Sequence, residues 1–564
     1  MLNTRPRHVS ATLAVILVGS LLAAACGSGT SSPSAAPSGG SQGSAAPSPT
    51  EAAMIPQVRA GIIGDESTIN PYTYVTGFPG WNLLMFQYDT LLQLDVAGLP
   101  QPWLASAYDV SDDGLTYTVQ LEPGVTWNDG EPLTAADVVF TVDYFKANTQ
   151  SRFTGNLKSV TAATATGDLE VTFTLEAPNP SFVLRALADV PIMPEHIWST
   201  VTNPAEATFE SPTNVGTGPY KIVEYTPDQS YRLEANADYF RGAPLVSEIV
   251  LVQYADESGL IAALRSDEVD VSFRSISPEQ VDQLSALDGM AIASGPEFTT
   301  QMLYYDVTKP PFDQVAIRRA MSLAIDRQDL ADTVFLGKAT LGNIGWTHPS
   351  SPAFNDAVKT TTDVAAAKAL LDEAGITDSD GDGIREFEGQ PLRPELLAPS
   401  DNPLRLRLAE LIKEMLNQIG IDPQVTSIER ETLVNRVWPD FDVANGRDYE
   451  MSMFGWSAPV QVDPAQITTL VHSDPALGSI NISGFSNAEA DRISNAIRVE
   501  PDDARRQELL DQLQQLIADE LPFIMLLYGD GLYPYRSTVY DQWAFIAGQG
   551  IVNKLSLLAP DARP

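Results

Sequence analysis

The chain has 564 residues, and its 73 acidic against 34 basic side chains give a formal net charge of −39. Affinity for nucleic acid and for anionic lipid comes from clustered Lys and Arg, so neither is expected to bind the body of this protein. A hydrophobic share of 44% is ordinary for a folded protein, and the length allows roughly two to four domains.

The N-terminus has the layout of a secretory signal. Arg5, Arg7 and His8 precede a mostly apolar stretch at 11–25, which ends in alanines directly before Cys26. The stretch is shorter than the roughly 20 residues that a permanent bilayer span needs. Cys26 is the only cysteine of the chain, so intramolecular disulfides are excluded and the fold must be stabilised by its core.

A cysteine after small residues and before Gly27 resembles the bacterial lipobox, in which the signal is cut before the cysteine and the thiol carries lipid. We therefore predict a signal peptide at 1–25 and a lipidated N-terminus with a flexible linker at 26–54, rich in Ser, Gly, Pro and Ala. One acyl chain binds a membrane weakly and two bind it firmly. The predicted location is the outer face of the cytoplasmic membrane. The alternative is a secreted protein with an ordinary buried thiol.

The body from about residue 55 mixes strands and helices. Residues 116–121 alternate polar and apolar side chains, as a half-buried strand does, and a turn at 122–124 leads to a predicted return segment at 125–130. Thr134 with Asp137 predicts a helix start with a capping box. Residues 169–175 form another strand pattern. The mixture predicts an α/β or α+β body.

Later segments repeat a helix, a glycine and a strand. A helix at 364–374 ends before Gly375, and a helix at 404–419 ends before Gly420 and leads to a strand at 421–428. A helix at 504–520 stops before Pro522. This succession is typical of a lobe with a parallel sheet.

Several motifs in order along the chain resemble the family 5 solute-binding proteins, the oligopeptide, dipeptide and nickel-binding branch of the receptors of ABC importers. The motifs stand at 101–107, 113–117, 121–130, 133–140, 215–221, 236–242, 311–326, 485–491 and 521–523. The resemblance covers residues 55–560.

The resemblance implies an α/β fold of the periplasmic-binding-protein type, with two lobes, an inserted third domain and a ligand cleft between the lobes. Strands at 302–306 and 523–528 are the expected crossings between the lobes. The implied domains are a first lobe at 55–305 with an insertion at about 86–212, a second lobe at 306–524, and a return segment at 525–564.

The sequence shows no catalytic constellation. The four histidines form no metal-binding pair, and no phosphate-binding loop, nucleophile elbow or dinucleotide fingerprint is present. We therefore expect no enzyme activity and no cofactor. Asp378, Asp380 and Asp382 match the start of a calcium loop, although its twelfth position is Gly389, and they predict at most a structural Ca²⁺. The alternative is an acidic turn.

The resemblance places the ligand in the cleft, and aromatic side chains with small polar neighbours are its expected lining. Candidates come from an N-terminal loop, the first crossing strand and a Gly-Trp segment of the second lobe, with the alternative that each aromatic side chain is core. They are Tyr72, Tyr74, Thr76, Gly77, Tyr304, Tyr305, Phe454, Trp456, Ser457 and Asp463.

One departure from the family concerns the ligand. In the peptide binders an aspartate three residues after the tryptophan pairs with the α-amino group of the peptide, but this position is Pro459 here, and the next acid is Asp463. A buried ammonium without a counter-charge is costly, so Asp463 is the candidate replacement.

The expected role is that of a monomeric receptor that delivers a small solute to ABC permease subunits and their ATPase. The solute is a peptide or peptide-like molecule; the first alternative is an oligosaccharide or another non-peptide organic ligand, and scarce histidine disfavours nickel. Two further hypotheses are a secreted hydrolase and a structural envelope lipoprotein.

Overall fold

The computed structural model describes residues 54–76 and 78–564. The predicted signal peptide, Cys26 and nearly all of the linker therefore lie outside the described residues. Among the residues that are described, none of the helices is long and apolar enough to span a bilayer.

A single 11-stranded sheet runs through both lobes, in the order β17-β16-β18-β12-β19-β11-β1-β10-β9-β8, with β13 also paired to β19. In the first lobe the strands are β1 (Val58–Ile63), β8 (Tyr220–Thr226), β9 (Ser230–Ala235), β10 (Glu248–Tyr254) and β11 (Val271–Ser272). In the second lobe they are β13 (Ala339–Leu341), β16 (Glu395–Pro399), β17 (Gln424–Ile428) and β18 (Met451–Phe454). Mixed α/β architecture is thus confirmed.

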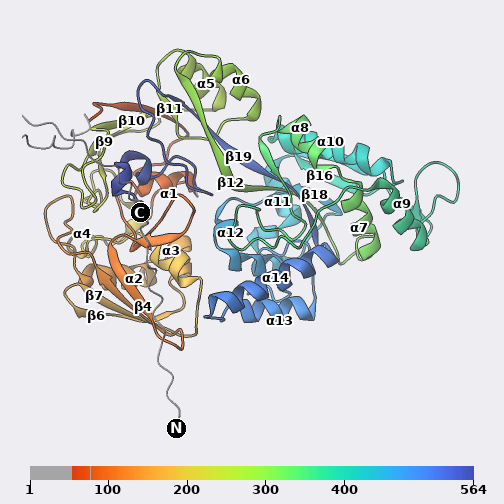
Figure 1. The fold of residues 1–564 in the computed structure, drawn as a ribbon, viewed down its shortest axis with the longest axis horizontal. Helices are drawn as coiled ribbons and strands as arrows, with labels where there is room; N and C mark the ends of the chain where they lie inside the picture. Colours follow the sequence, from red (N-terminus) through yellow and green to blue (C-terminus); the bar gives the residue numbers. More distant parts are fainter. Residues whose placement is uncertain (1–53, 77) are drawn as a thin grey trace, which may run out of the picture. The chain divides into compact units, whose positions relative to one another are not determined.

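Two long antiparallel strands connect the lobes: β12 (Met290–Tyr305) and β19 (Phe523–Arg536), seen side by side in Figure 1. They include the predicted crossings but extend well beyond them. Their pairing is interrupted by a register shift between Pro296 and Thr299, where Phe298 has a φ of 62°. Such a bulge bends a strand locally.

The buried apolar side chains divide at the crossing strands. The first-lobe clusters take residues 58–290 and 532–558, and the second-lobe clusters take residues 302–528. Tyr305, the predicted end of the first lobe, packs in a second-lobe cluster. The domain boundaries given above remain predictions.

A separate sheet with the order β4-β5-β7-β6 lies within the predicted insertion. Its strands are β4 (Ala105–Val110), β5 (Thr116–Leu121), β6 (Val160–Gly167) and β7 (Glu170–Leu175). The predicted return at 125–130 does not form a strand: only Thr126 makes an isolated bridge, and β5 pairs with β4 and β7 instead. Two short hairpins pair β2 (Leu92–Leu94) with β3 (Pro100–Pro102) and β14 (Glu386–Phe387) with β15 (Gln390–Pro391).

The helices begin and end close to the predicted positions. The capping box of Thr134 and Asp137 is confirmed, and the helices predicted at 364–374, 404–419 and 504–520 are α9, α10 and α14. In the first lobe the helices are α1 (Phe78–Leu84), α2 (Ala135–Ala147), α3 (Ser151–Asn156), α4 (Glu195–Trp198), α5 (Glu257–Arg265) and α6 (Val281–Ser285). In the second they are α7 (Val315–Ala324), α8 (Arg327–Val334), α9 (Val364–Glu373), α10 (Pro403–Asn417), α11 (Arg430–Val437), α12 (Pro459–Val462), α13 (Ala488–Ile497) and α14 (Asp503–Glu520).

Candidate functional site

A cavity of about 520 Å³ lies between the lobes. The first lobe contributes the ends of β4 and β5, with Tyr108 and Tyr117, and a proline-rich segment around Pro178. The second lobe contributes residues 462–465 after α12 and the start of α14. The volume is within the range of about 300–1,000 Å³ that small-molecule sites occupy.

The segment after β18, which does not line the cavity, is fixed to the first crossing strand. Trp456 donates its backbone N–H to Thr300 Oγ1 (2.7 Å), and the Thr300 N–H donates to the Trp456 carbonyl (3.0 Å). Gly455 lies so close to this strand that a Cβ would stand 1.9 Å from the Thr300 carbonyl oxygen. Any other residue would therefore push the Gly-Trp segment away from β12.

Trp456 belongs to a series of aromatic side chains that starts at the crossing strand. Its indole N–H donates to the Tyr304 hydroxyl (2.8 Å), and its ring lies 5.2 Å from Phe454 and 5.5 Å from Trp438. Trp438 in turn contacts Phe441 at 5.2 Å, and Phe441 is 69% exposed. The series therefore joins the second-lobe core to the surface.

The sequence analysis missed Trp438 and Phe441. Phe441 and the preceding Asp440 both have φ above 50°, which is unfavourable for a bulky residue and persists where surrounding contacts impose it. Two aromatic residues within a polar stretch at 438–442 were the available signal.

Asp463 is 3% exposed and lines the cavity. Its carboxylate accepts hydrogen bonds from the Ala465 N–H (3.1 Å) and from Gln466 Nε2 (3.2 Å), and so caps the short helix η6 (Pro464–Leu470). Across the described part of the chain, no Lys, Arg or His nitrogen is paired with it. The structure thus brings to the cavity a buried carboxylate that forms no ion pair within the described chain.

The N-terminal loop of the first lobe is tied to its own lobe. Tyr72 stacks on Phe145 at 5.5 Å and donates its hydroxyl to the Asn148 carbonyl (2.7 Å), and burial raises the pKa of this phenol. Tyr74 packs against Phe153, and burial also raises its pKa.

The same loop is organised by Glu66, which is 2% exposed and which sequence reasoning missed. Its carboxylate accepts from the N–H groups of Val75 (3.0 Å) and Thr76 (2.8 Å) and from the Thr76 hydroxyl. Gly77 lies outside the described residues. Glu66 follows β1, and ligands of α/β sheets bind beyond the carboxyl ends of such strands.

Adjacent residues of a strand point to opposite faces, and this separates the two predicted tyrosines of β12. Tyr304 lies with Trp456 and Phe454 in one second-lobe cluster. Tyr305 is fully buried in the other cluster, stacked on Phe312 at 5.5 Å, with its hydroxyl donated to the Leu521 carbonyl (2.5 Å). Neither tyrosine lines the cavity, and among the described residues predicted to bind ligand only Asp463 does. Ser457 is exposed beside Trp456.

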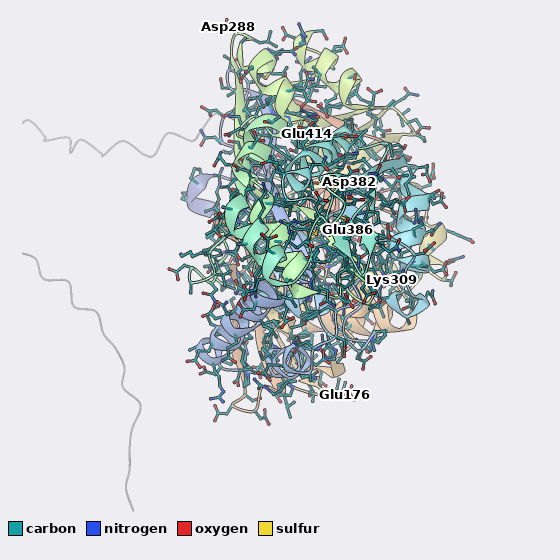
Figure 2. All side chains as sticks on the ribbon, turned by 90° about the vertical axis from the view of Figure 1, so that its right-hand side faces the viewer. Glu176, Asp288, Lys309, Asp382, Glu386 and Glu414 are labelled. Carbon is teal, nitrogen blue, oxygen red and sulfur yellow. The ribbon has the colours of Figure 1, made fainter. Side chains whose placement is uncertain are left out.

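The acidic loop is on the surface of the second lobe, where Figure 2 labels Asp382 and Glu386. Asp378, Asp380 and Asp382 are exposed, and their carboxylate oxygens lie within 4.8 Å of one another. These carboxylates also accept backbone N–H groups of the loop, such as that of Gly381 at 2.7 Å. A structural Ca²⁺ here remains a prediction, and calorimetry with and without Ca²⁺ tests it through the melting temperature.

Comparisons with known proteins agree with the architecture. The sequence model of the bacterial extracellular solute-binding proteins, family 5 Middle, matches residues 100–477. The oligopeptide-binding protein AppA of Bacillus subtilis is 27% identical over 528 residues, which are 92% of either chain. Di/tripeptide-binding protein 1 of Pseudomonas aeruginosa is 24% identical over 87% of this chain and 93% of its own.

Among solved structures, the ABC transporter substrate-binding protein CtaP of Listeria monocytogenes superposes with a TM-score of 0.77 at 26% identity. The superposition covers 89% of this chain and 99% of CtaP. Because the family model matches well over half of the sequence, the chain belongs to the bacterial extracellular solute-binding proteins of family 5.

Proposed function

We propose that this protein is the receptor of an ABC importer and that it captures a peptide or peptide-like solute between its lobes. The observation that carries the proposal is the cavity between the lobes, which Asp463 lines as a buried carboxylate that forms no ion pair with a described residue. A peptide ammonium would supply the missing charge. The names of the relatives, an oligopeptide-binding and a di/tripeptide-binding protein, support the same ligand class.

The expected mechanism is closure of the lobes around the solute. Within the sheet of the described chain, the lobes are joined through the crossing strands, and hinge closure of this kind is a common response to ligand. A closed cavity removes water from the ligand and strengthens its contacts with the walls. The closed form is then the one that the permease subunits and their ATPase recognise.

Binding of a peptide pool, read as thermal stabilisation, tests the proposal. We expect a rise in melting temperature with the pool for the mature protein, and a smaller rise for Asp463→Asn. Asparagine is also a good helix cap, so this variant removes the charge and keeps the fold. Glu489→Gln, on the exposed face of α13, is the matched control. Stabilisation by no peptide would refute the peptide assignment.

An oligosaccharide is the second candidate, because one specific observation favours it. The rings of Trp438, Trp456 and Phe441 form a series that reaches the surface, and aromatic faces bind sugars well. Stabilisation by an oligosaccharide, lost in Trp438→Ala and absent with every peptide, would replace the first candidate.

The remaining assignments extend the same proposal. A diacylated Cys26 would hold a monomeric receptor at the outer face of the cytoplasmic membrane, and mass spectrometry of the mature N-terminus tests this. The receptor role requires no catalysis, so we expect no turnover of generic hydrolase substrates. A purely structural lipoprotein would show no compaction in solution scattering when ligand is added.

A further inference from the structure

The cavity between the lobes has an uneven distribution of charge. Among the described residues that line it, Arg506 is the only cation, while Asp463 and Asp503 are carboxylates. Arg506 is already engaged: one guanidinium nitrogen bonds the Asp503 carboxylate and another donates to the Glu500 carbonyl (3.1 Å). The described lining therefore carries two carboxylates against one guanidinium, and that guanidinium already has an ion-pair partner.

The first crossing strand, which does not line the cavity, carries a further carboxylate between the lobes. Glu297 lies in the irregular part of β12, and its carboxylate accepts the Tyr533 hydroxyl (2.6 Å). No Lys or Arg of the described chain is within ion-pair distance of it. Arg274, whose charge acts on Glu297, pairs more closely with Glu66 at 3.7 Å. Burial raises the pKa of Glu297, and the hydrogen bond from Tyr533 and the charge of Arg274 oppose this rise without cancelling it.

Gly548 of the return segment is packed between the two lobes. A Cβ on Gly548 would contact both Phe298, the neighbour of Glu297, and Val462, the neighbour of Asp463, at 2.9 Å. Gly548 also donates its N–H to the Pro296 carbonyl (2.9 Å). Asp463 and Glu297 thus flank one continuous contact between the lobes.

We propose that the site selects solutes by net charge: it takes a ligand with an ammonium group and excludes a ligand carboxylate from the closed cavity. The inference rests on the proposed function and narrows its ligand class from peptides in general to cationic solutes. These include peptides whose carboxyl end is blocked or lies outside the cavity, and amino sugars.

The physical reason is the cost of removing a carboxylate from water. A buried ion that finds no partner loses its hydration without compensation, and near Asp463 a second carboxylate adds like-charge repulsion. An ammonium in the same place gains an ion pair in a medium of low dielectric constant. A free zwitterionic tripeptide can satisfy only one of its two charges here.

Calorimetric titration with matched ligand pools tests the inference. The probes are a randomised tripeptide pool with a C-terminal amide, the same pool as the free acid, N-acetylated forms of both, and the disaccharide of glucosamine beside its N-acetylated form. We expect the amide pool to bind at least about tenfold more tightly than the free acid, and acetylation to abolish binding, as the loss of one partner of a buried charge pair implies.

The outcomes separate the two proposals. Free acids that bind as tightly as amides would overturn the charge selection and leave the peptide receptor in place. Binding of glucosamine disaccharide alone would overturn the peptide assignment and support the charge selection. Binding of neutral N-acetylated probes alone, or of no probe at all, would overturn both.

Two variants give an independent measurement with opposite expectations. Asp503→Asn frees Arg506 at the edge of the cavity, so the free-acid pool should gain affinity relative to the amide pool. Asp463→Asn removes the anion, so the amide pool should lose its advantage. Glu489→Gln should leave the ratio unchanged. An amide-to-acid ratio that is the same in all three variants would contradict the inference.

Discussion

Glu66 and Asp463 are buried carboxylates on opposite lobes, and they differ in what they hold. Glu66 accepts hydrogen bonds from Val75 and Thr76 and faces Arg274, so its capacity is taken up by the first lobe. Asp463 accepts two hydrogen bonds, both from the helix that it caps, and lines the cavity without forming an ion pair with a described residue. Burial of a carboxylate therefore does not identify its role, whereas its hydrogen-bond and ion-pair partners do.

The largest expected effect is that of Glu66→Ala. It leaves two loop N–H groups without an acceptor and Arg274 without its carboxylate, and breaking a buried ion pair costs about 3–5 kcal/mol. The free energy of unfolding in denaturant should fall by this amount. Glu66→Gln, which keeps an acceptor oxygen, should lose less. Equal stability of all three proteins would mean that Glu66 does not hold the loop.

A buried histidine of the second lobe should make the free energy of unfolding depend on pH. His348 is 1% exposed, packs against Phe298 and Tyr528, and receives a hydrogen bond from the Ser350 N–H at Nδ1. Burial lowers the pKa of His348 to about 4, from an ordinary 6.5. The unfolded chain therefore binds more protons between these values, so the free energy of unfolding falls as the pH drops through this window.

The expected loss is on the order of 3 kcal/mol for this group, since one pKa unit corresponds to about 1.4 kcal/mol. His348→Asn keeps an acceptor for Ser350 and removes the titrating ring. The difference in stability between wild type and this variant should therefore shrink below pH 6.5. A difference that does not change between pH 7 and pH 4 would exclude a neutral buried His348.

Two substitutions of Asp463 distinguish its contribution to stability from its contribution to ligand affinity. Asp463→Ala removes the cap of η6 and should cost about 0.5–2 kcal/mol in unfolding, whereas Asp463→Asn should cost little. Both variants should bind the tripeptide pool with a C-terminal amide more weakly than wild type does, as titration calorimetry would show. If Asp463→Asn bound as tightly as wild type, Asp463 would resemble Glu66 as a purely structural acid.

The smallest effects distinguish the two tyrosines of β12. Tyr305→Phe removes a hydrogen bond to a backbone carbonyl and should cost about 0.5–1.5 kcal/mol in stability without affecting binding. Tyr304→Phe leaves the indole N–H of Trp456 without its acceptor and should also weaken binding. Thermal unfolding and ligand titration of the two variants provide the measurement. If both variants bound ligand as tightly as wild type, neither tyrosine would contribute to binding.

Sequence reasoning identified the elements with strong local signals. Alternation at 116–121 and the capping box of Thr134 depend on neighbouring residues, and both are present in the structure. The prediction for the segment 125–130 was wrong because β5 pairs on one side with β4, which precedes it, and on the other with β7, which is distant in sequence.

The site was harder to predict for the same reason. Tyr304, Phe454 and Trp456 were predicted together and do lie in one cluster, but none of them lines the cavity, and the face that each tyrosine of β12 presents was not predicted. Glu66, Trp438 and Phe441 were missed because their role depends on contacts formed only in the folded chain. The two-lobed α/β fold came from the order of motifs, which no single element specifies.

The irregular pairing at residues 296–299 has a consequence for motion. The two lobes are connected by the hydrogen-bonded strands β12 and β19, and not by two independent flexible linkers. Bending should concentrate where the pairing of β12 with β19 is already interrupted, next to Phe298. Amides in this short stretch should exchange with deuterium faster than those on either side, and capture of a solute should slow them first.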